Sequence, residues 1–196
     1  MTTLGQLLDE IARLADDHSQ WFTPAERADA LYEAALAWAE GNAGRYQTDE
    51  AARSALSFLT PPPIDGRGET IRLNALDGVW RILSLSVLTP GGWRGARPQR
   101  IDAFQPASWL HSPSFAYPAY TDQGGSDKPT SGSGEQTVRV LTILPGPMVY
   151  RLHYLRLPLK PDLTRLAAPY EGAWPTITRE WCEGAATRLR ALRLQA

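Results

Sequence analysis

The stretch GETIRLNALDGVWRILSLSVL, residues 68–88, decides the fold because its apolar residues follow a different period from those before it. Residues 70–73 and 79–88 contain alternating or continuous apolar runs, which are typical of β-strands. Residues 74–78 between them have the composition of a turn. We therefore expect two strands here, at the point where a helical part of the chain gives way to a β-rich part.

Helices are expected on the N-terminal side of this stretch. Residues 3–17 place leucine, isoleucine and alanine side chains at the i, i+3, i+4, i+7 spacing of one helical face. Thr3 and Gln6 have the spacing of a capping box, in which each side chain binds the backbone of the other residue. This pattern predicts a first helix with one apolar stripe.

A second and a third helix follow the first one. The segment TPAE at residues 23–26 supplies a threonine cap, a proline in the first turn and a glutamate three residues after the cap. We expect this helix to end at Gly41 and a shorter helix to begin at a Thr48 cap. Three prolines at 61–63 then stop the helix because each proline lacks a backbone N–H donor.

The C-terminal side of the opening stretch is β-rich and then helical. Residues 97–121 have no steady period and indicate short strands and loops, and DQGGSDKPTSGSGEQ at 122–136 is typical of a flexible loop. TVRVLTILP and MVYRLHYLRLP predict two strands, and Pro145-Gly146-Pro147 between them predicts a hairpin turn. A linker at 161–173 leads to a terminal helix from residue 175 or 176.

These elements predict an α+β fold. The fold class expected is a helical bundle, built from the N-terminal helices and a C-terminal helix, with a β-rich inserted middle region. The corresponding parts are residues 1–60, the β-rich lobe 61–160, and the linker and returning helix 161–196. In this arrangement Trp181 and Leu189 of the last helix pack against the N-terminal helices.

Composition and charge exclude several classes of protein. The chain has 196 residues, of which 43% are hydrophobic, and a formal net charge of −1, which argues against binding nucleic acid by bulk electrostatics. A single cysteine excludes an intrachain disulfide, and no apolar run approaches the roughly 18 to 20 residues of a membrane span. Residues 1–60 carry a net charge of −6 and residues 61–196 carry +5. This split indicates either solvated helix faces or head-to-tail contact between copies.

The residues with catalytic or ligand-binding chemistry form no recognisable site. No glycine-rich phosphate loop or nucleophile elbow is present, and His18, His111 and His153 have no second ligand at metal-binding spacing. Cys182 would need a partner such as His153 to act as a nucleophile, and a small buried residue fits its helical context better. We therefore expect no enzyme activity, no cofactor and no metal, with a small soluble enzyme whose site is not recognisable as the less favoured alternative.

One basic and aromatic patch stands out in the middle of the chain. Arg94, Arg97 and Arg100 lie close to Trp93 in the sequence. Such a patch can stack nucleic-acid bases, but three arginines over seven residues are a weak signal for that role. A protein interface or a surface loop is the favoured interpretation.

The order of the motifs resembles that of the head-to-tail adaptor (connector) proteins of tailed bacteriophages. Over roughly residues 20–192, WFTPAE and LYEAALAWA are followed by a proline break, IRL and VWRILSLSVL, then PASWL and YPAYT, a strand ending in ILPGP, YRLHYLRLP, and a closing helix ITREWCEGAATRL. The resemblance implies a virion structural protein of the neck, made in the host cytoplasm. It implies a homo-oligomeric ring, commonly a dodecamer, beneath the portal protein. Such a ring extends the DNA channel for genome ejection without sequence-specific contact and carries the tail or a stopper protein. A tail-completion or tail-terminator protein is the alternative within the same structural class.

Two groups of residues are the candidate partner contacts. Arg188, Arg190 and Arg193 crowd the last turns of the terminal helix, where they either dock on the portal or complement the helix dipole. The 122–136 loop, with Gly124, Gly125, Lys128, Ser131 and Ser133, is expected to be ordered by an adjacent copy or another virion protein, since its composition buries too little surface to order itself. No membrane partner is expected.

Overall fold

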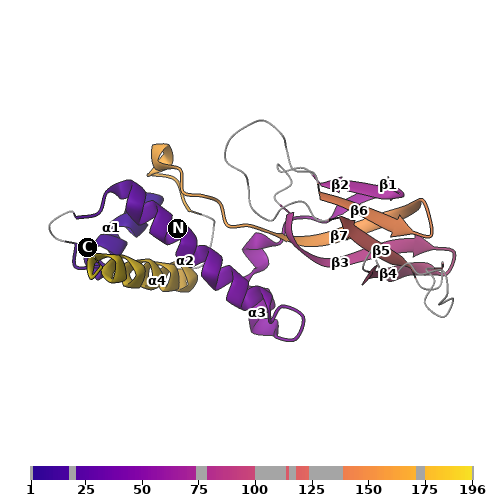
Figure 1. Cartoon of the computed structure of the whole chain (residues 1–196), viewed down its shortest axis with the longest axis horizontal. Helices are drawn as coiled ribbons and strands as arrows, with labels where there is room; N and C mark the ends of the chain where they lie inside the picture. The colour runs from indigo at the N-terminus through magenta and orange to yellow at the C-terminus, as the bar shows by residue number, and fades with distance from the viewer. Residues whose placement is uncertain are drawn as a thin grey trace. The chain divides into compact units, whose positions relative to one another are not determined.

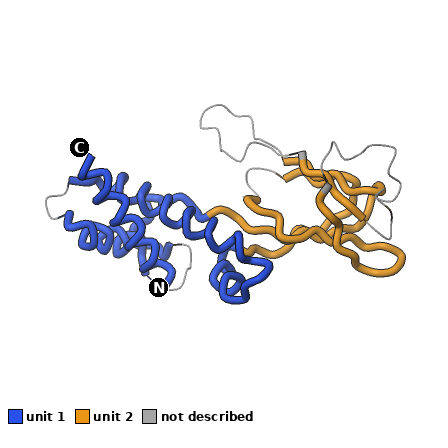
Figure 2. The backbone as a smooth tube through the Cα atoms, turned by 60° about the horizontal axis from the view of Figure 1, so that its bottom comes forward, with its two compact units in different colours: residues 1–59, 158–196 blue, residues 60–157 orange. Residues whose placement is uncertain are grey.

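The computed structural model describes residues 2–17, 21–73, 79–99, 114, 118–123, 139–170 and 175–195. The chain divides into two compact units (Figure 2). Unit 1 contains residues Met1–Leu59 and Pro158–Ala196, and unit 2 contains Thr60–Leu157. The chain therefore leaves unit 1 once, forms unit 2, and returns.

Unit 1 is helical. Its elements are α1 (Leu4–Leu14), α2 (Pro24–Ala43), α3 (Glu50–Ala55), the short 3-10 helices η1 (Ser57–Leu59) and η5 (Leu163–Arg165), and α4 (Pro175–Arg193). Both predicted capping boxes are confirmed, at Thr3 with Gln6 and at Thr23 with Glu26. Local sequence thus sets where α1 and α2 begin.

Two helix boundaries differ from those predicted. α2 continues past Gly41 to Ala43 and is capped by Gly44. The N-cap of α3 is Asp49 instead of Thr48, because the Asp49 carboxylate accepts a hydrogen bond from the Ala51 backbone N–H at 2.8 Å. A carboxylate at this position also interacts favourably with the positive end of the helix dipole.

The core of unit 1 lies between α1, α2 and α4. Its buried residues include Leu7, Leu8, Ile11, Leu31, Ala35, Trp181, Ala185 and Leu189. The ring of Trp181 lies 5.7 Å from that of Trp38 and 5.8 Å from that of Phe58, centroid to centroid. The predicted packing of Trp181 and Leu189 on the N-terminal helices is therefore confirmed.

Unit 2 contains one seven-stranded sheet. Its strands are β1 (Ile64–Gly68), β2 (Thr70–Leu73), β3 (Val79–Thr89), β4 (Gly92–Gln99), β5 (Ala119–Gln123), β6 (Arg139–Leu144) and β7 (Met148–Arg156). Their order in the sheet is β1-β7-β3-β4-β5-β6-β2. The neighbouring strands are antiparallel except β4 and β5, which are parallel.

The sheet curls until it is nearly closed, like a barrel (Figure 1). β1 and β2 lie at its two opposite edges, yet only Glu69 separates them in the sequence. The two edges must therefore meet at this residue, and the Ile143 N–H of β6 donates to the Glu69 carbonyl at 2.7 Å. Closure leaves few unpaired strand edges. The interior is filled by a second buried cluster that includes Ile71, Leu85, Val87, Leu141, Ile143 and Leu152.

The predicted fold class is wrong. The chain is a mixed α/β protein whose seven-stranded barrel-like sheet is a principal architecture in its own right, and it is not a helical bundle with a β-rich insertion. The prediction underestimated the sheet because β1, β4 and β5 have little alternation of their own. Their hydrogen bonds come from partners far away in the sequence, and such pairing overrides weak local preference.

The predicted hairpin at 145–147 is also wrong. β6 and β7 are both present, but β6 pairs with β5 and β2, whereas β7 pairs with β1 and β3. The turn therefore carries the chain from one part of the sheet to another. A turn sequence shows that two strands are connected, and the sheet topology decides whether they pair.

Candidate interaction surfaces

Two of the three arginines near the C-terminus bind other helices of unit 1. Arg188 forms an ion pair with Glu33 on α2. Arg190 donates a hydrogen bond to the backbone carbonyl of Leu14, the last residue of α1. Carbonyl groups in the last turn of a helix lack an intrahelical hydrogen-bond donor, and Arg190 supplies one to the last turn of α1. These two side chains fasten the end of α4 to its neighbours, and their docking on a partner stays a prediction.

The third arginine belongs to an exposed patch at the end of α4. Arg193 lies with its guanidinium carbon 5.5 Å from the centroid of the Trp21 ring. Trp21 is 56% exposed, and the neighbouring Leu192 and Leu194 are 50% and 89% exposed. The spacing of Ile177, Trp181, Ala185 and Leu189 in the sequence predicts a buried stripe that extends to Leu192, and the exposure of Leu192 shows that the stripe ends at Leu189. We call Trp21, Leu192, Arg193 and Leu194 the C-terminal patch.

The predicted loop contacts lie outside the described residues. This holds for Gly124, Gly125, Lys128, Ser131 and Ser133, and for the histidines at positions 18 and 111. At the start of that predicted loop, Asp122 belongs to β5 and accepts a hydrogen bond from Arg139 of β6 at 3.0 Å. This residue is therefore ordered within its own subunit.

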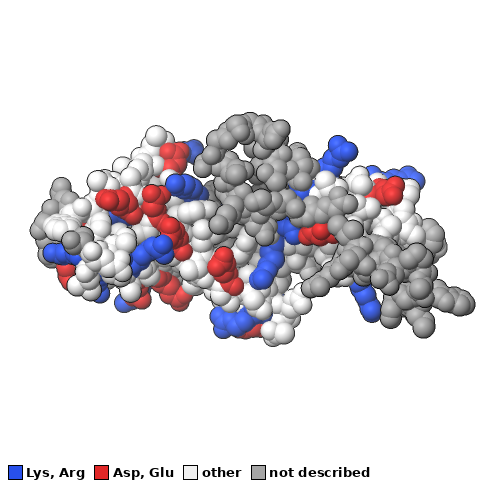
Figure 3. Space-filling view, viewed as in Figure 1, with Lys and Arg blue, Asp and Glu red and all other residues white. Residues whose placement is uncertain are grey.

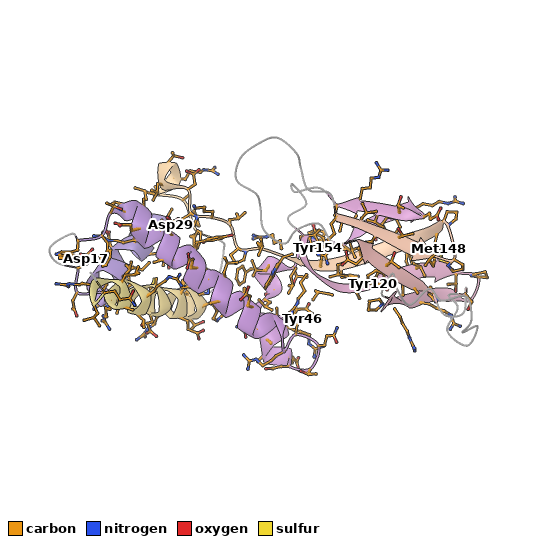
Figure 4. The ribbon with its side chains drawn as sticks, viewed as in Figure 1. Asp17, Asp29, Tyr46, Tyr120, Met148 and Tyr154 are labelled. Atoms are coloured by element: carbon orange, nitrogen blue, oxygen red, sulfur yellow. The ribbon has the colours of Figure 1, made fainter. Side chains whose placement is uncertain are left out.

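A groove of about 560 Å³ runs along α2. It is lined by Asp29, Tyr32, Glu33, Leu36, Ala37, Glu40 and Lys160, all of which belong to unit 1. The lining thus combines aromatic and aliphatic side chains with three carboxylates. Figure 3 shows acidic side chains in a row along α2, and Figure 4 labels Asp29 on this helix.

Only part of the acidic charge of the α2 groove is neutralised within the chain. Lys160 forms an ion pair with Asp29 at 3.1 Å, and both side chains are exposed. Glu33 has Arg188 as its partner. No basic partner of Glu40 is found in the part of the chain that the structure describes. The groove thus keeps an acidic character.

A second surface lies on the outer side of the sheet in unit 2. Leu88 of β3 and Trp93 of β4 are directly opposite each other in the antiparallel register, 44% and 47% exposed. They are the only exposed large hydrophobic residues in the described part of unit 2. A cross-strand pair of this kind forms one continuous apolar spot.

Basic side chains surround this apolar spot. The guanidinium carbon of Arg151, from β7, lies 5.2 Å from the centroid of the Trp93 ring. Arg67 of β1 and Arg97 of β4 point to the same outer face by strand alternation. We call Arg67, Leu88, Trp93, Arg97 and Arg151 the Trp93 face.

One carboxylate lies on the Trp93 face. Asp65 of β1 accepts hydrogen bonds from Arg151 at 2.8 Å and 3.0 Å. The hydrogen bond from Arg151 lowers the pKa of the Asp65 carboxyl, so this pair is ionised at neutral pH. Arg151 is therefore held in place over Trp93 with its charge partly neutralised.

The sequence identified only part of this surface. Trp93 and Arg97 were both in the predicted basic and aromatic patch, but Arg94 faces the other side because it is opposite the buried Val87. Arg100 lies outside the described residues. Arg151 was missed because it comes from a distant strand, although the alternation within MVYRLHYLRLP places it on an outward face.

The buried thiol of unit 1 is far from reactive. Cys182 is 1% exposed, and burial raises the pKa of its thiol to about 12. Its sulfur lies 3.8 Å from the Leu7 carbonyl oxygen, while the histidine considered as its partner, His153, belongs to unit 2. Reactive cysteines have a lowered thiol pKa, so this environment matches a packing role.

Two further findings concern ions and membranes. No group of three or more His, Cys, Asp or Glu side chains among the described residues is placed to hold a metal ion. None of the helices in the described ranges combines the length and the apolar composition that crossing a lipid bilayer requires.

No protein-family model matches the chain, and no curated protein matches it either. The chain's own residues, together with the resemblance in the order of its elements, therefore carry the functional proposal.

Proposed function

We propose that this protein is a head-to-tail adaptor of a tailed bacteriophage. In this role it forms a homo-oligomeric ring under the portal protein, extends the DNA channel and joins the capsid to the tail or to a stopper protein. The proposal assigns it no catalytic step, and DNA passes through the ring without sequence-specific contact.

The observation that carries the proposal is the return of the chain to its N-terminal helices after the β unit. α4 packs on α1 and α2 in one core, and the whole seven-stranded sheet lies between them in the sequence. The order helices, β region, closing helix is the one that the resemblance to the adaptor family implies. The barrel-like closure of the β region was not expected from it.

The C-terminal patch supports the portal contact that the proposal requires. Three large apolar side chains are exposed there beside Arg193, whereas large exposed hydrophobic residues normally occur singly on soluble proteins. Aromatic and arginine residues are also enriched in the energetically dominant part of protein interfaces. We therefore assign the portal contact to this patch, with Arg188 and Arg190 holding α4 in position for it.

The test removes the three C-terminal residues of the patch and keeps the core. Deleting residues 192–196 spares Leu189, which is 1% exposed, and the ion pair of Arg188. The truncated chain should keep the circular dichroism spectrum of the full chain but lose its binding to portal rings or DNA-filled heads. Leu159→Asp is the matched control, since Leu159 is 60% exposed and belongs to the same unit. A truncated chain that still joins heads to tails like the full chain would refute the assigned contact.

A further inference from the structure

We propose that the Trp93 face of one copy docks in the α2 groove of the next copy. The inference rests on the proposed function in that both require a homo-oligomer, and it names the two surfaces that meet. The contact is head-to-tail, because each copy offers one face and one groove. Repeated contacts of this kind close into a ring or continue as a filament.

The Trp93 face has the composition of the central part of an interface. Its centre is apolar, with Leu88 and Trp93 side by side, and arginines stand around it. Tryptophan and arginine are the residues whose removal most often costs binding energy at protein interfaces. The ion pair with Asp65 already fixes Arg151, so little side-chain entropy remains to be lost on binding.

The α2 groove has the complementary composition. It is an open depression along α2, and its lining includes the apolar surfaces of Tyr32 and Leu36. Its lining also carries Asp29, Glu33 and Glu40 against the arginines of the other surface. Each surface thus offers an apolar centre with charges of one predominant sign around it.

The net charges of the two units agree with this pairing. Unit 1 contains fourteen acidic and ten basic residues, a net charge of −4. Unit 2 contains seven acidic and ten basic residues, a net charge of +3. Opposite charges on the surfaces that meet raise the association rate and disfavour pairing of like surfaces. Unit 2 of one copy is therefore electrostatically complementary to unit 1 of a second copy of the same chain.

The number of charges favours a protein partner over a nucleic acid. Arg151 is paired with Asp65, which leaves Arg67 and Arg97 as the cations of the Trp93 face without a carboxylate partner among the described residues. Affinity for duplex DNA comes mainly from the number of phosphates that the protein neutralises, and two cations supply little of it. The groove likewise presents few unpaired charges, since Asp29 and Glu33 already have Lys160 and Arg188 as partners.

The experiment disables each surface separately and then mixes the two variants. Trp93→Glu with Arg97→Glu alters the face and keeps the Asp65–Arg151 pair, and Ala37→Arg with Glu40→Arg fills the groove at exposed helix positions. Size-exclusion chromatography with light scattering gives the mass of each full-length chain at low salt. Leu166→Glu is the matched control, since Leu166 is 44% exposed, similar to Trp93, and lies in unit 1 outside the groove and the C-terminal patch.

The expected results are specific to a head-to-tail contact. The unaltered chain and the Leu166 control should self-associate. Each double variant should self-associate at least about 30-fold more weakly, which is the effect of losing one dominant interface residue. A mixture of the two double variants should give a one-to-one dimer that grows no further, because each supplies the intact surface that the other lacks. Raising the salt concentration should weaken this dimer.

Each alternative outcome overturns the pairing of these surfaces. An unaltered chain that stays monomeric, or double variants that assemble normally, would refute it. So would duplex DNA that binds the unaltered chain and not the face variant, since the face would then serve a nucleic acid. If the variants assemble normally into rings that bind portal, the surfaces are wrong and the adaptor function stands. If the mixed dimer forms but the unaltered chain binds no portal, the surfaces are right and the adaptor function is wrong.

Discussion

Replacing Trp181 with alanine should destabilise unit 1 by about 3 kcal/mol. The side chain is fully buried against Trp38, Phe58 and Tyr170, with ring centroids 5.7 Å to 6.0 Å away. Removing a buried tryptophan usually costs about 3–5 kcal/mol, because it leaves a cavity. However, no acceptor for the Trp181 indole N–H is found among the described residues, and an unsatisfied buried donor costs about 1–3 kcal/mol. The substitution also removes this cost, so the expected loss is at the low end.

A conservative variant separates the two contributions. Trp181→Phe keeps most of the aromatic packing and removes the unpaired N–H, so it should lose only about 1 kcal/mol. Urea unfolding followed by far-UV circular dichroism reports unit 1, which contains all the described α-helices. A loss well below 1 kcal/mol for Trp181→Ala would show that the residue is not central to the core. Equal losses for the two variants would show that the indole N–H is satisfied.

Three further predictions concern single side chains. Burial disfavours the charge of Asp17, but hydrogen bonds from Arg27 and two backbone N–H groups outweigh it and lower its pKa. The contribution of the Asp17 carboxylate to the free energy of unfolding is therefore complete at pH values above the pKa of this group in the unfolded chain, and it is lost as pH falls through the lower pKa of the folded chain. Asp17→Asn should therefore destabilise the protein by about 3 kcal/mol at neutral pH and by less in acid, as measured by urea unfolding at several pH values. The Cys182 thiol, with its pKa raised to about 12, should react with a thiol reagent at mildly alkaline pH only after unfolding, and rapid labelling of the native chain would contradict its burial. A Cβ at Gly66 would overlap the Tyr150 hydroxyl, so Gly66→Ala should cost about 1–3 kcal/mol in unfolding experiments and much less when Tyr150 is replaced by alanine.

The helices could be predicted because their signals are local. Threonine caps three residues before Gln6 and Glu26 fix the starts of α1 and α2, and the apolar stripe from Ile177 to Leu189 fixes the buried face of α4. The orphan N–H groups that these caps satisfy belong to the same few residues.

The sheet could be predicted only in part, because its hydrogen bonds join distant residues. β2, β3, β6 and β7 alternate clearly and were expected. β1, with the sequence IDGRG, contains two glycines and forms a strand because five of its residues pair with β7. The closure of the sheet depends on Glu69 joining its two edges, and no local pattern indicates that.

The candidate surfaces divide in the same way. Trp93 and Arg97 are close in the sequence and were identified together, whereas Arg151 reaches Trp93 from another strand. The arginines of α4 were expected to be available to a partner, and the structure engages Arg188 with Glu33 on another helix. Which charges remain available depends on helix packing, which local sequence does not specify.

The adaptor function is tested most directly by electron microscopy of the purified full chain mixed with purified portal rings. We predict closed rings of this protein seated on one end of the portal rings, with one continuous channel through both. Portal rings that stay bare while the chain remains folded and dispersed in solution would contradict the proposed function.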